Sequence, residues 1–92
     1  MRLIVREEVV EDLKRIHDWI AADRPRAAFA MVDRIRDRIG SLTDPGMAEK
    51  GRPGRQPGTR ELIQRPYVIV YKVDRDVEEI TVLAIFHGRQ DR

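Results

Sequence analysis

Arginine side chains and one histidine gather in the second half of the chain, and these are the residues whose types could do chemistry. The set consists of Arg52, Arg55, Arg60, Arg65, His87 and Arg89. A guanidinium group binds carboxylates and phosphates through paired hydrogen bonds and stacks on flat rings. An imidazole has a pKa that suits acid–base work near neutral pH. The pattern predicts a surface for an anionic partner, with His87 either a general base or phosphate contact, or a cap on the end of a strand.

The charges are unevenly distributed along the chain. It has 18 basic and 16 acidic residues, a net charge of +2, and 15 of the basic residues are arginine. Residues 1–44 carry nine of each sign, whereas residues 45–72 carry six basic residues against two acidic ones. The positive excess therefore falls on the segment that holds most of these arginines, and it faces either an anionic partner or solvent.

Some classes of function are excluded by composition. The chain has no cysteine and only two histidines, which are far apart in the sequence. Disulfides, thiol nucleophiles and thiolate metal sites are thereby excluded, and we expect no metal and no other cofactor. The first six residues contain only three successive apolar residues, too few for a signal-peptide core or a membrane span. We expect a cytoplasmic protein that does not bind membranes.

Two amphipathic helices must position these side chains, after an edge strand at residues 1–6. The first is predicted from Glu7 to Ala22, because its apolar residues recur at helical spacing. That apolar face consists of Val9, Val10, Leu13, Ile16 and Ile20. The second helix is predicted to run to about Ser41, with Asp23 as its N-cap and Pro25 in its first turn. The two helices form a hairpin.

Three strands are predicted after a connection rich in glycine and proline that ends at Gly58. They cover residues 60–64, 67–73 and 79–87, with a hairpin turn at residues 74–76. The middle strand is apolar on most of both faces and should lie centrally. In the last strand, alternation places Val82 and Phe86 on one face and Leu83 and Ile85 on the other. Because both sheet faces are apolar and the hairpin covers only one, we expect a partner on the other.

The motifs of this second half resemble the RelE/ParE superfamily of bacterial toxins, and more closely its ParE, or plasmid stabilisation, branch. They are Gly51-Arg52-Pro53, Gly58-Thr59-Arg60-Glu61-Leu62, Arg65-Pro66-Tyr67-Val68-Ile69 and His87-Gly88-Arg89. The resemblance spans nearly the whole chain. It implies one α+β domain over residues 1–92, in the order β-α-α-β-β-β, with a helical hairpin packed on one twisted, mainly antiparallel sheet.

The resemblance also implies a function. It suggests the toxin of a type II toxin–antitoxin system, held inactive in a hetero-oligomer with its antitoxin and acting as an inhibitor of DNA gyrase. No catalytic residue is then required. Target binding is expected at Arg52, Arg55, Arg60, Arg65, His87 and Arg89, and the tail from Arg89 to Arg92 is expected to contact gyrase or its DNA. Antitoxin binding is expected at Leu13, Trp19 and Phe86.

Two alternatives stay open. One is a ribosome-dependent mRNA endoribonuclease of the RelE type, in which a base removes the 2′-hydroxyl proton and cations stabilise the phosphorane-like transition state. His87 would be the catalytic residue, but Val68 stands where that branch typically has an arginine, and valine cannot stabilise such charge. The other alternative is a non-toxic protein that binds the antitoxin and co-represses its operon.

Overall fold

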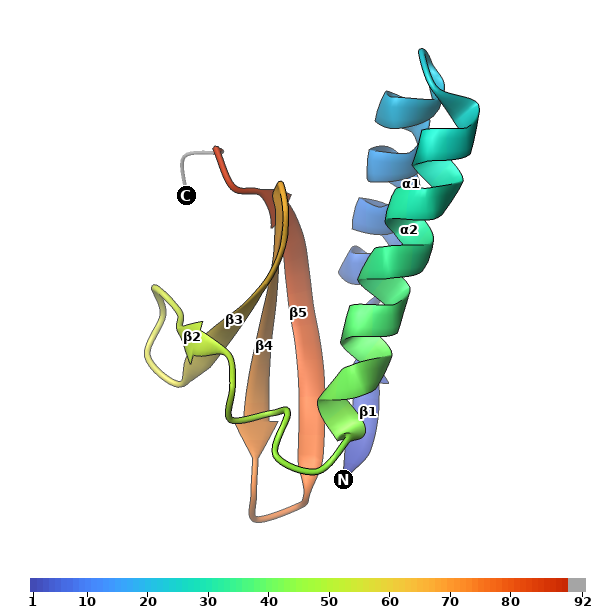
Figure 1. The fold of residues 1–92 in the computed structure, drawn as a ribbon. Helices are drawn as coiled ribbons and strands as arrows, with labels where there is room; N and C mark the ends of the chain where they lie inside the picture. Colours follow the sequence, from blue (N-terminus) through green and yellow to red (C-terminus); the bar gives the residue numbers. More distant parts are fainter. Residues whose placement is uncertain (90–92) are drawn as a thin grey trace.

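The structure, a computed structural model, describes residues 1–89 as two helices packed on one five-stranded sheet (Figure 1). Its elements are β1 (Arg2–Val5), α1 (Glu7–Ala21), α2 (Pro25–Gly40), the 3-10 turn η1 (Ser41–Thr43), β2 (Arg52–Pro53), β3 (Thr59–Gln64), β4 (Tyr67–Asp74) and β5 (Glu79–His87). The predicted α+β order is confirmed. Strand β2 is an addition, because two residues in a glycine-rich segment carry no strand signal.

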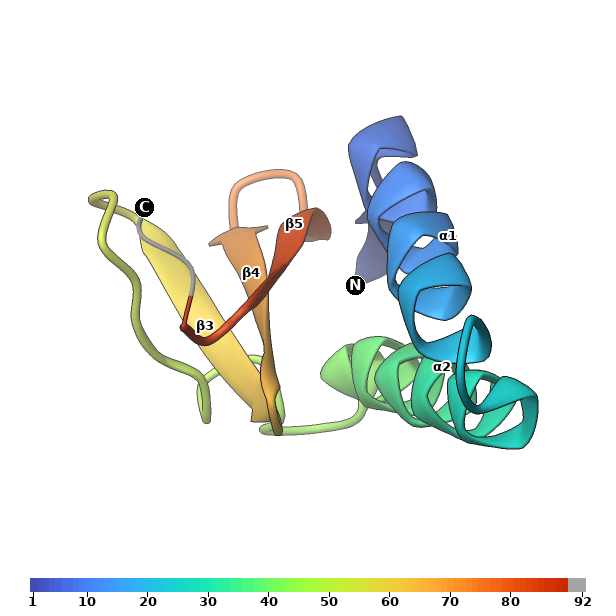
Figure 2. The same ribbon diagram turned by 90° about the horizontal axis from the view of Figure 1, so that it is seen from above.

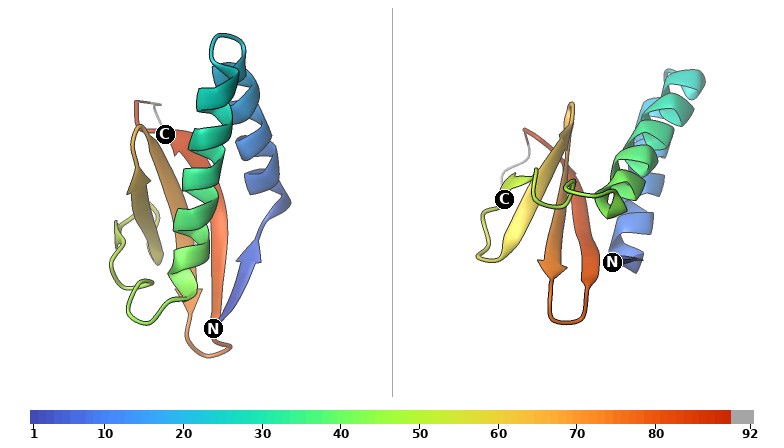
Figure 3. Two further views of the ribbon diagram at one scale, coloured as in Figure 1. Left: turned by 45° about the vertical axis from the view of Figure 1, so that its right-hand side comes forward. Right: turned by 60° about the horizontal axis from the view of Figure 1, so that its bottom comes forward.

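The sheet has the order β1-β5-β4-β3-β2, and only the β1–β5 pair is parallel. Strand β4 lies at its centre, as its apolar faces predicted. Strand β1 lies at the edge, and its register runs from Arg2 opposite Glu79 to Val5 opposite Val82. It therefore flanks only the first half of β5, as the left view of Figure 3 shows. Within residues 1–89, no strand flanks residues 83–87 on that side.

The helical hairpin covers one face of the sheet (Figure 2). It does so because the apolar stripes of both helices need burial, which stabilises by about 25 cal/mol for each Å² of apolar surface removed from water. The helices bury Val9, Leu13, Ile16, Ile35 and Ile39 against strand residues that include Leu62, Tyr67, Ile69, Tyr71, Ile80, Val82 and Ile85.

Two predictions about the helices are wrong. Asp23 does not cap α2, because the helix begins at Pro25 with Arg24 in the cap position and no capping side-chain hydrogen bond. Proline itself starts the turn, since its fixed φ is already helical and it has no N–H to satisfy. Val10 does not belong to the buried face of α1 but lies 58 % exposed. Two adjacent valines cannot both face the sheet at 100° per residue.

A bulge in β5 overturns the predicted alternation of its second half. Consecutive residues of β4 pair with Val82 and then with Ala84, so Leu83 is an extra residue on β5. The extra residue turns Ile85 to the face of Val82, which packs on the helices, and Phe86 to the opposite face. A pattern with a period of two does not reveal such a bulge. The prediction that Phe86 lies on the same face as Val82 is therefore wrong.

Candidate functional site

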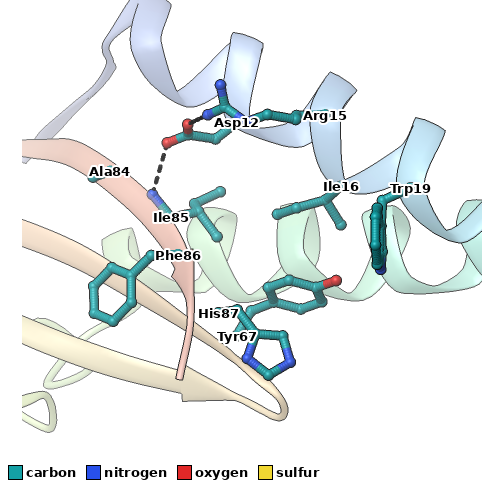
Figure 4. A pocket seen from close by; sticks show the side chains of 9 residues that line it. All are labelled: Asp12, Arg15, Ile16, Trp19, Tyr67, Ala84, Ile85, Phe86 and His87. Carbon is teal, nitrogen blue, oxygen red and sulfur yellow. Dashed lines mark hydrogen bonds and ion pairs between the residues drawn. The ribbon is translucent and has the colours of Figure 1, made fainter. Parts of the chain in front are cut away.

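A groove opens between the side of α1 and the end of β5, where the helix leaves the sheet (Figure 4). We call it the β5 groove, and its volume is about 620 Å³. It is lined by Asp12, Arg15, Ile16, Trp19, Tyr67, Ala84, Ile85, Phe86 and His87. Its walls are mostly apolar, with a carboxylate, a phenol, an imidazole and an indole placed among them. Such a mixture suits a protein segment that buries apolar side chains and makes a few directed hydrogen bonds.

Asp12 joins α1 to the open edge of β5. One of its carboxylate oxygens accepts a hydrogen bond of 2.9 Å from the backbone N–H of Ile85, and the other pairs with Arg15 one helical turn later. The Asp12 side chain is only 12 % exposed. A carboxylate here takes the place that a carbonyl of a neighbouring strand would have. Asp12 is not among the site residues expected from the sequence, although its spacing of four from Ile16 places it beside the buried stripe of α1.

Tyr67 and His87 form the inner end of the β5 groove. They lie opposite each other on β4 and β5, with ring centroids 5.6 Å apart in an edge-to-face contact. The Nδ1 atom of His87 accepts a hydrogen bond of 3.1 Å from the backbone N–H of Arg89, so the neutral ring carries its proton on Nε2. Burial raises the pKa of the Tyr67 hydroxyl, which therefore stays a neutral donor. The pair offers donors rather than a base.

The three residues predicted to bind the antitoxin lie in different places. Trp19 is 80 % exposed at the rim of the β5 groove, where a large apolar ring is unusual without a partner. Phe86 is among the residues that line the groove, but Figure 4 shows its ring on the side of β5 that faces away from Ile16 and Trp19. Leu13 is 8 % exposed and belongs to the core. A partner that contacts both Trp19 and Phe86 must therefore pass over the edge or the end of β5.

The six predicted target-binding residues form two groups, not one surface. The first group, Arg52, Arg55 and Arg60, lies at the β2 border of the sheet, where Pro53 of β2 pairs with Arg60 of β3. The second group, Arg65, His87 and Arg89, lies where the β3–β4 turn meets the end of β5. Those segments are joined by a hydrogen bond of 2.7 Å from the Gly88 N–H to the Pro66 carbonyl. The predicted tail contact extends to residues 90–92, which lie outside the described residues.

Arg60 holds the loop that leads into β2. Its guanidinium group donates to the backbone carbonyls of Glu49, at 3.2 Å, and Gly51, at 2.9 Å. The hydroxyl of Tyr71, which is fully buried, donates to the carbonyl of Ala48 at 2.7 Å and accepts from the N–H of Gly51 at 3.1 Å. Burial raises the pKa of Tyr71, and its bond to Gly51 opposes that rise only in part. Tyr71 and Arg60 thus fix the loop backbone.

Arg52 and Arg65 have contrasting surroundings. Both Nε and a terminal nitrogen of Arg52 lie 2.9 Å from the carboxylate of Glu61, which is only 4 % exposed. This pair sits on the sheet face away from the helices, and much of the Arg52 charge is neutralised there. Arg52 itself is 55 % exposed. Arg65 in the β3–β4 turn and Arg89 after β5 are exposed as well, and neither forms an ion pair within residues 1–89. Less of the second group's positive charge is therefore neutralised within the described chain than that of Arg52.

A second groove, of about 520 Å³, follows the side of the helical hairpin. Its apolar lining includes Val10 and Phe29, both exposed, together with Leu13 from the core. His17 contacts the Phe29 ring edge-on, with centroids 5.1 Å apart. We call this the hairpin groove. It gives the chain a second apolar surface, distinct from the β5 groove, for the same or another partner.

The part of the chain that the structure describes contains neither a metal-binding cluster nor a helix that could span a membrane. Across residues 1–89, no three His, Asp or Glu side chains cluster in a way that would hold a metal ion. In the same residues, neither helix has the length and apolar run that crossing a bilayer requires. The described chemistry thus rests on arginines, aromatic rings and the Asp12 carboxylate.

Comparisons with known proteins give one consistent result. Residues 3–92 match the family model described as the ParE toxin of the type II toxin–antitoxin system parDE. The candidate toxin Y4kP of Sinorhizobium fredii is 41 % identical over 73 residues, which are 77 % of this chain and 74 % of that protein.

Solved structures agree. A chain of the chromosomal ParDE system from P. aeruginosa has a TM-score of 0.83 and 28 % identity, with 95 % of each chain covered. A chain of the RelBE2 toxin–antitoxin complex from Mycobacterium tuberculosis shares the fold alone, with a TM-score of 0.57, 19 % identity and coverage of 94 % of this chain and 95 % of that one. From the family model, the relative and the fold together, the chain belongs to the ParE family, the toxins of type II toxin–antitoxin systems.

Proposed function

We propose that this toxin inhibits DNA gyrase in the cytoplasm, and that a cognate antitoxin silences it by binding across the β5 groove. The observation that carries the proposal is the group formed by Arg65, His87 and Arg89 at the end of the sheet. It presents two exposed guanidinium groups and a donor imidazole on segments joined by the hydrogen bond from Gly88 to Pro66. Such a surface suits the phosphates of DNA or an acidic protein patch, and it needs no catalytic base.

The same geometry weighs against the ribonuclease alternative. Val68, which replaces the arginine typical of the nuclease branch, is 4 % exposed within β4 and offers no charge. His87 uses Nδ1 to accept a bond from the backbone, so its neutral ring has no lone pair left at Nε2 to remove a proton. A base and a cation at the scissile phosphate are what that reaction needs.

The β2 border has another role in this proposal. Arg60 holds carbonyls of its own loop and Arg52 pairs with Glu61, so both act mainly on the shape of the border. Arg55 lies exposed in the turn between β2 and β3 and adds positive charge beside them. We therefore rank Arg65 and Arg89 above Arg52, Arg55 and Arg60 for direct contact with the target.

For the antitoxin, Trp19 is the proposed anchor. An exposed tryptophan beside an apolar groove is the type of residue that carries much of the energy of a protein interface. Phe86 would add contact where the antitoxin crosses the end of β5. Leu13 would support the interface from below, through the packing of α1, rather than by touching the antitoxin in the β5 groove.

The test is a supercoiling reaction with purified DNA gyrase and toxin freed from its antitoxin. We expect lost supercoiling and accumulation of cleaved DNA. Combined Arg65→Glu and Arg89→Glu changes should abolish both effects, whereas Arg26→Glu with Arg34→Glu, an equal charge change on exposed residues of α2, should not. If the folded toxin leaves gyrase active but cleaves mRNA on ribosomes, the gyrase proposal is wrong. If it does neither yet binds antitoxin, the co-repressor alternative replaces it.

A further inference from the structure

The second half of β5 is an open strand edge beside an apolar groove, which is the usual starting point for pairing between identical chains. Strand β1 ends opposite Val82, and within residues 1–89 no strand follows it along residues 83–87. That stretch includes Ile85, which is buried, and Leu83 and Phe86, which are half-buried. An apolar strand edge without a neighbouring strand can pair antiparallel with the same edge of a second copy across a two-fold axis.

Asp12 lies at this edge and opposes both features that would favour such pairing, the available backbone N–H and the apolar character of the strand. Its carboxylate accepts the Ile85 N–H at 2.9 Å, which is a donor that an added strand would otherwise use. It also holds a negative charge against the strand, with its side chain only 12 % exposed. An incoming strand would have to displace the carboxylate from the Ile85 N–H and desolvate the ion pair that Asp12 makes with Arg15, and removing an ion pair from water costs free energy.

Arg15 keeps the carboxylate in this position. Its guanidinium group pairs with the oxygen of Asp12 that does not bind Ile85, one helical turn along α1. The bond to Ile85 and the pair with Arg15 together hold the carboxylate against the strand. Figure 4 shows the carboxylate between the Arg15 side chain and the backbone of β5.

We infer that Asp12 is a guard charge that keeps the free toxin monomeric by blocking strand pairing between two copies at the open edge of β5. The inference concerns the toxin alone and does not depend on gyrase being the target. Natural sheets commonly protect their edges with inward-pointing charges of this type. Here the charge comes from a helix that lies beside the strand and not from the strand itself.

The experiment measures self-association of the full chain, freed from antitoxin, by sedimentation over a range of concentrations. We expect Asp12→Ala to lower the dissociation constant for dimer formation by about tenfold or more, since the edge loses its charge and gains an unpaired N–H. Glu11→Ala is the matched control, because it removes the same charge from an exposed position one residue away. Association by the control to the same degree would overturn the inference.

Hydrogen exchange at the Ile85 amide supplies a second readout that simple loss of stability would not give. In the wild type the amide should exchange slowly at every concentration. In Asp12→Ala it should exchange fast when dilute and slowly when concentrated, because the partner's strand then binds it. Exchange that does not depend on concentration would contradict the guard role.

If Asp12→Ala does not fold, Asp12→Asn decides. Asparagine retains an acceptor for Ile85 but removes the charge, so its dimer should be tighter than that of the wild type. Equal dissociation constants for Asp12→Asn and the wild type would show that the charge guards nothing, and the inference would be wrong.

Discussion

At the β2 border of the sheet, side chains from the strands hold a loop in place, whereas at the β5 border a helix side chain holds a strand and a groove stays open beside it. Tyr71 and Arg60 bind the loop backbone at the first border. Asp12 binds Ile85 at the second. The difference shows that charge in a sequence does not say what an arginine does. Much of the β2 border's charge is used internally, while the exposed arginines at the far end of the sheet face solvent.

The largest expected effect comes from a steric clash that disrupts the hydrogen bonds between Tyr71 and the loop at the β2 border. A methyl group on Gly51 would lie 2.1 Å from the Tyr71 hydroxyl, which must then move and lose its bonds to the loop. We expect Gly51→Ala to lower the free energy of unfolding by about 3 kcal/mol in urea titrations. Gly40→Ala is the control, since α2 has room for a methyl there. It should be neutral or stabilising by up to about 1 kcal/mol. Similar losses in both variants would show that the loop is not clamped.

At the β5 border, substitutions should lower the affinity for the antitoxin and leave the stability of the fold unchanged. We expect Trp19→Ala to weaken antitoxin binding by about 2 kcal/mol, or roughly thirtyfold, in calorimetry, with the midpoint of unfolding unchanged because the ring is mostly exposed. Val77→Ala, which shortens an exposed apolar residue in the β4–β5 turn, is the comparison and should leave binding unchanged. Unaltered affinity for Trp19→Ala would remove the β5 groove from the antitoxin interface.

Two tyrosines of the same strand sharpen the comparison. Tyr71→Phe leaves the Ala48 carbonyl and the Gly51 N–H without their partner, so the free energy of unfolding should fall by about 1–3 kcal/mol. Tyr67→Phe should change it by less than about 0.5 kcal/mol, because no described residue bonds to its hydroxyl. Thermal unfolding of the two variants side by side checks this. Equal decreases in the free energy of unfolding would mean that the Tyr67 hydroxyl stabilises the fold as much as the Tyr71 hydroxyl does.

The smallest expected effect is the acid response of the loop. Hydrogen bonding to Arg75 holds the pKa of Glu49 below its usual 4.5. A carboxyl whose pKa is lowered by folding stabilises the fold above its unfolded pKa and loses that contribution as pH falls through the folded value. Wild type and Glu49→Gln should therefore differ by a small constant amount above pH 4.5 and converge below it. A difference that persists at pH 2 would assign it to packing instead of charge.

Much of the fold followed from apolar spacing, while the site did so only in part. The helices and long strands were predictable because their apolar residues recur with a period set by each element. The bulge at Leu83 was not, since one inserted residue keeps the strand apolar and only reverses its faces. The role of Arg60 was hidden for a related reason: a guanidinium that binds phosphate and one that binds a carbonyl of its own loop look the same in a sequence.

The sheet order has a consequence for how the toxin is made. Strand β1 pairs only with β5, so residues 2–5 must wait for residues 79–82 before they find a partner. Contacts between distant segments form late, because a long stretch of chain must first be ordered between them. In a nascent chain on the ribosome, strand β1 therefore stays unpaired until β5 has emerged. The complete sheet of this toxin therefore forms only after residues 79–82 have left the ribosome.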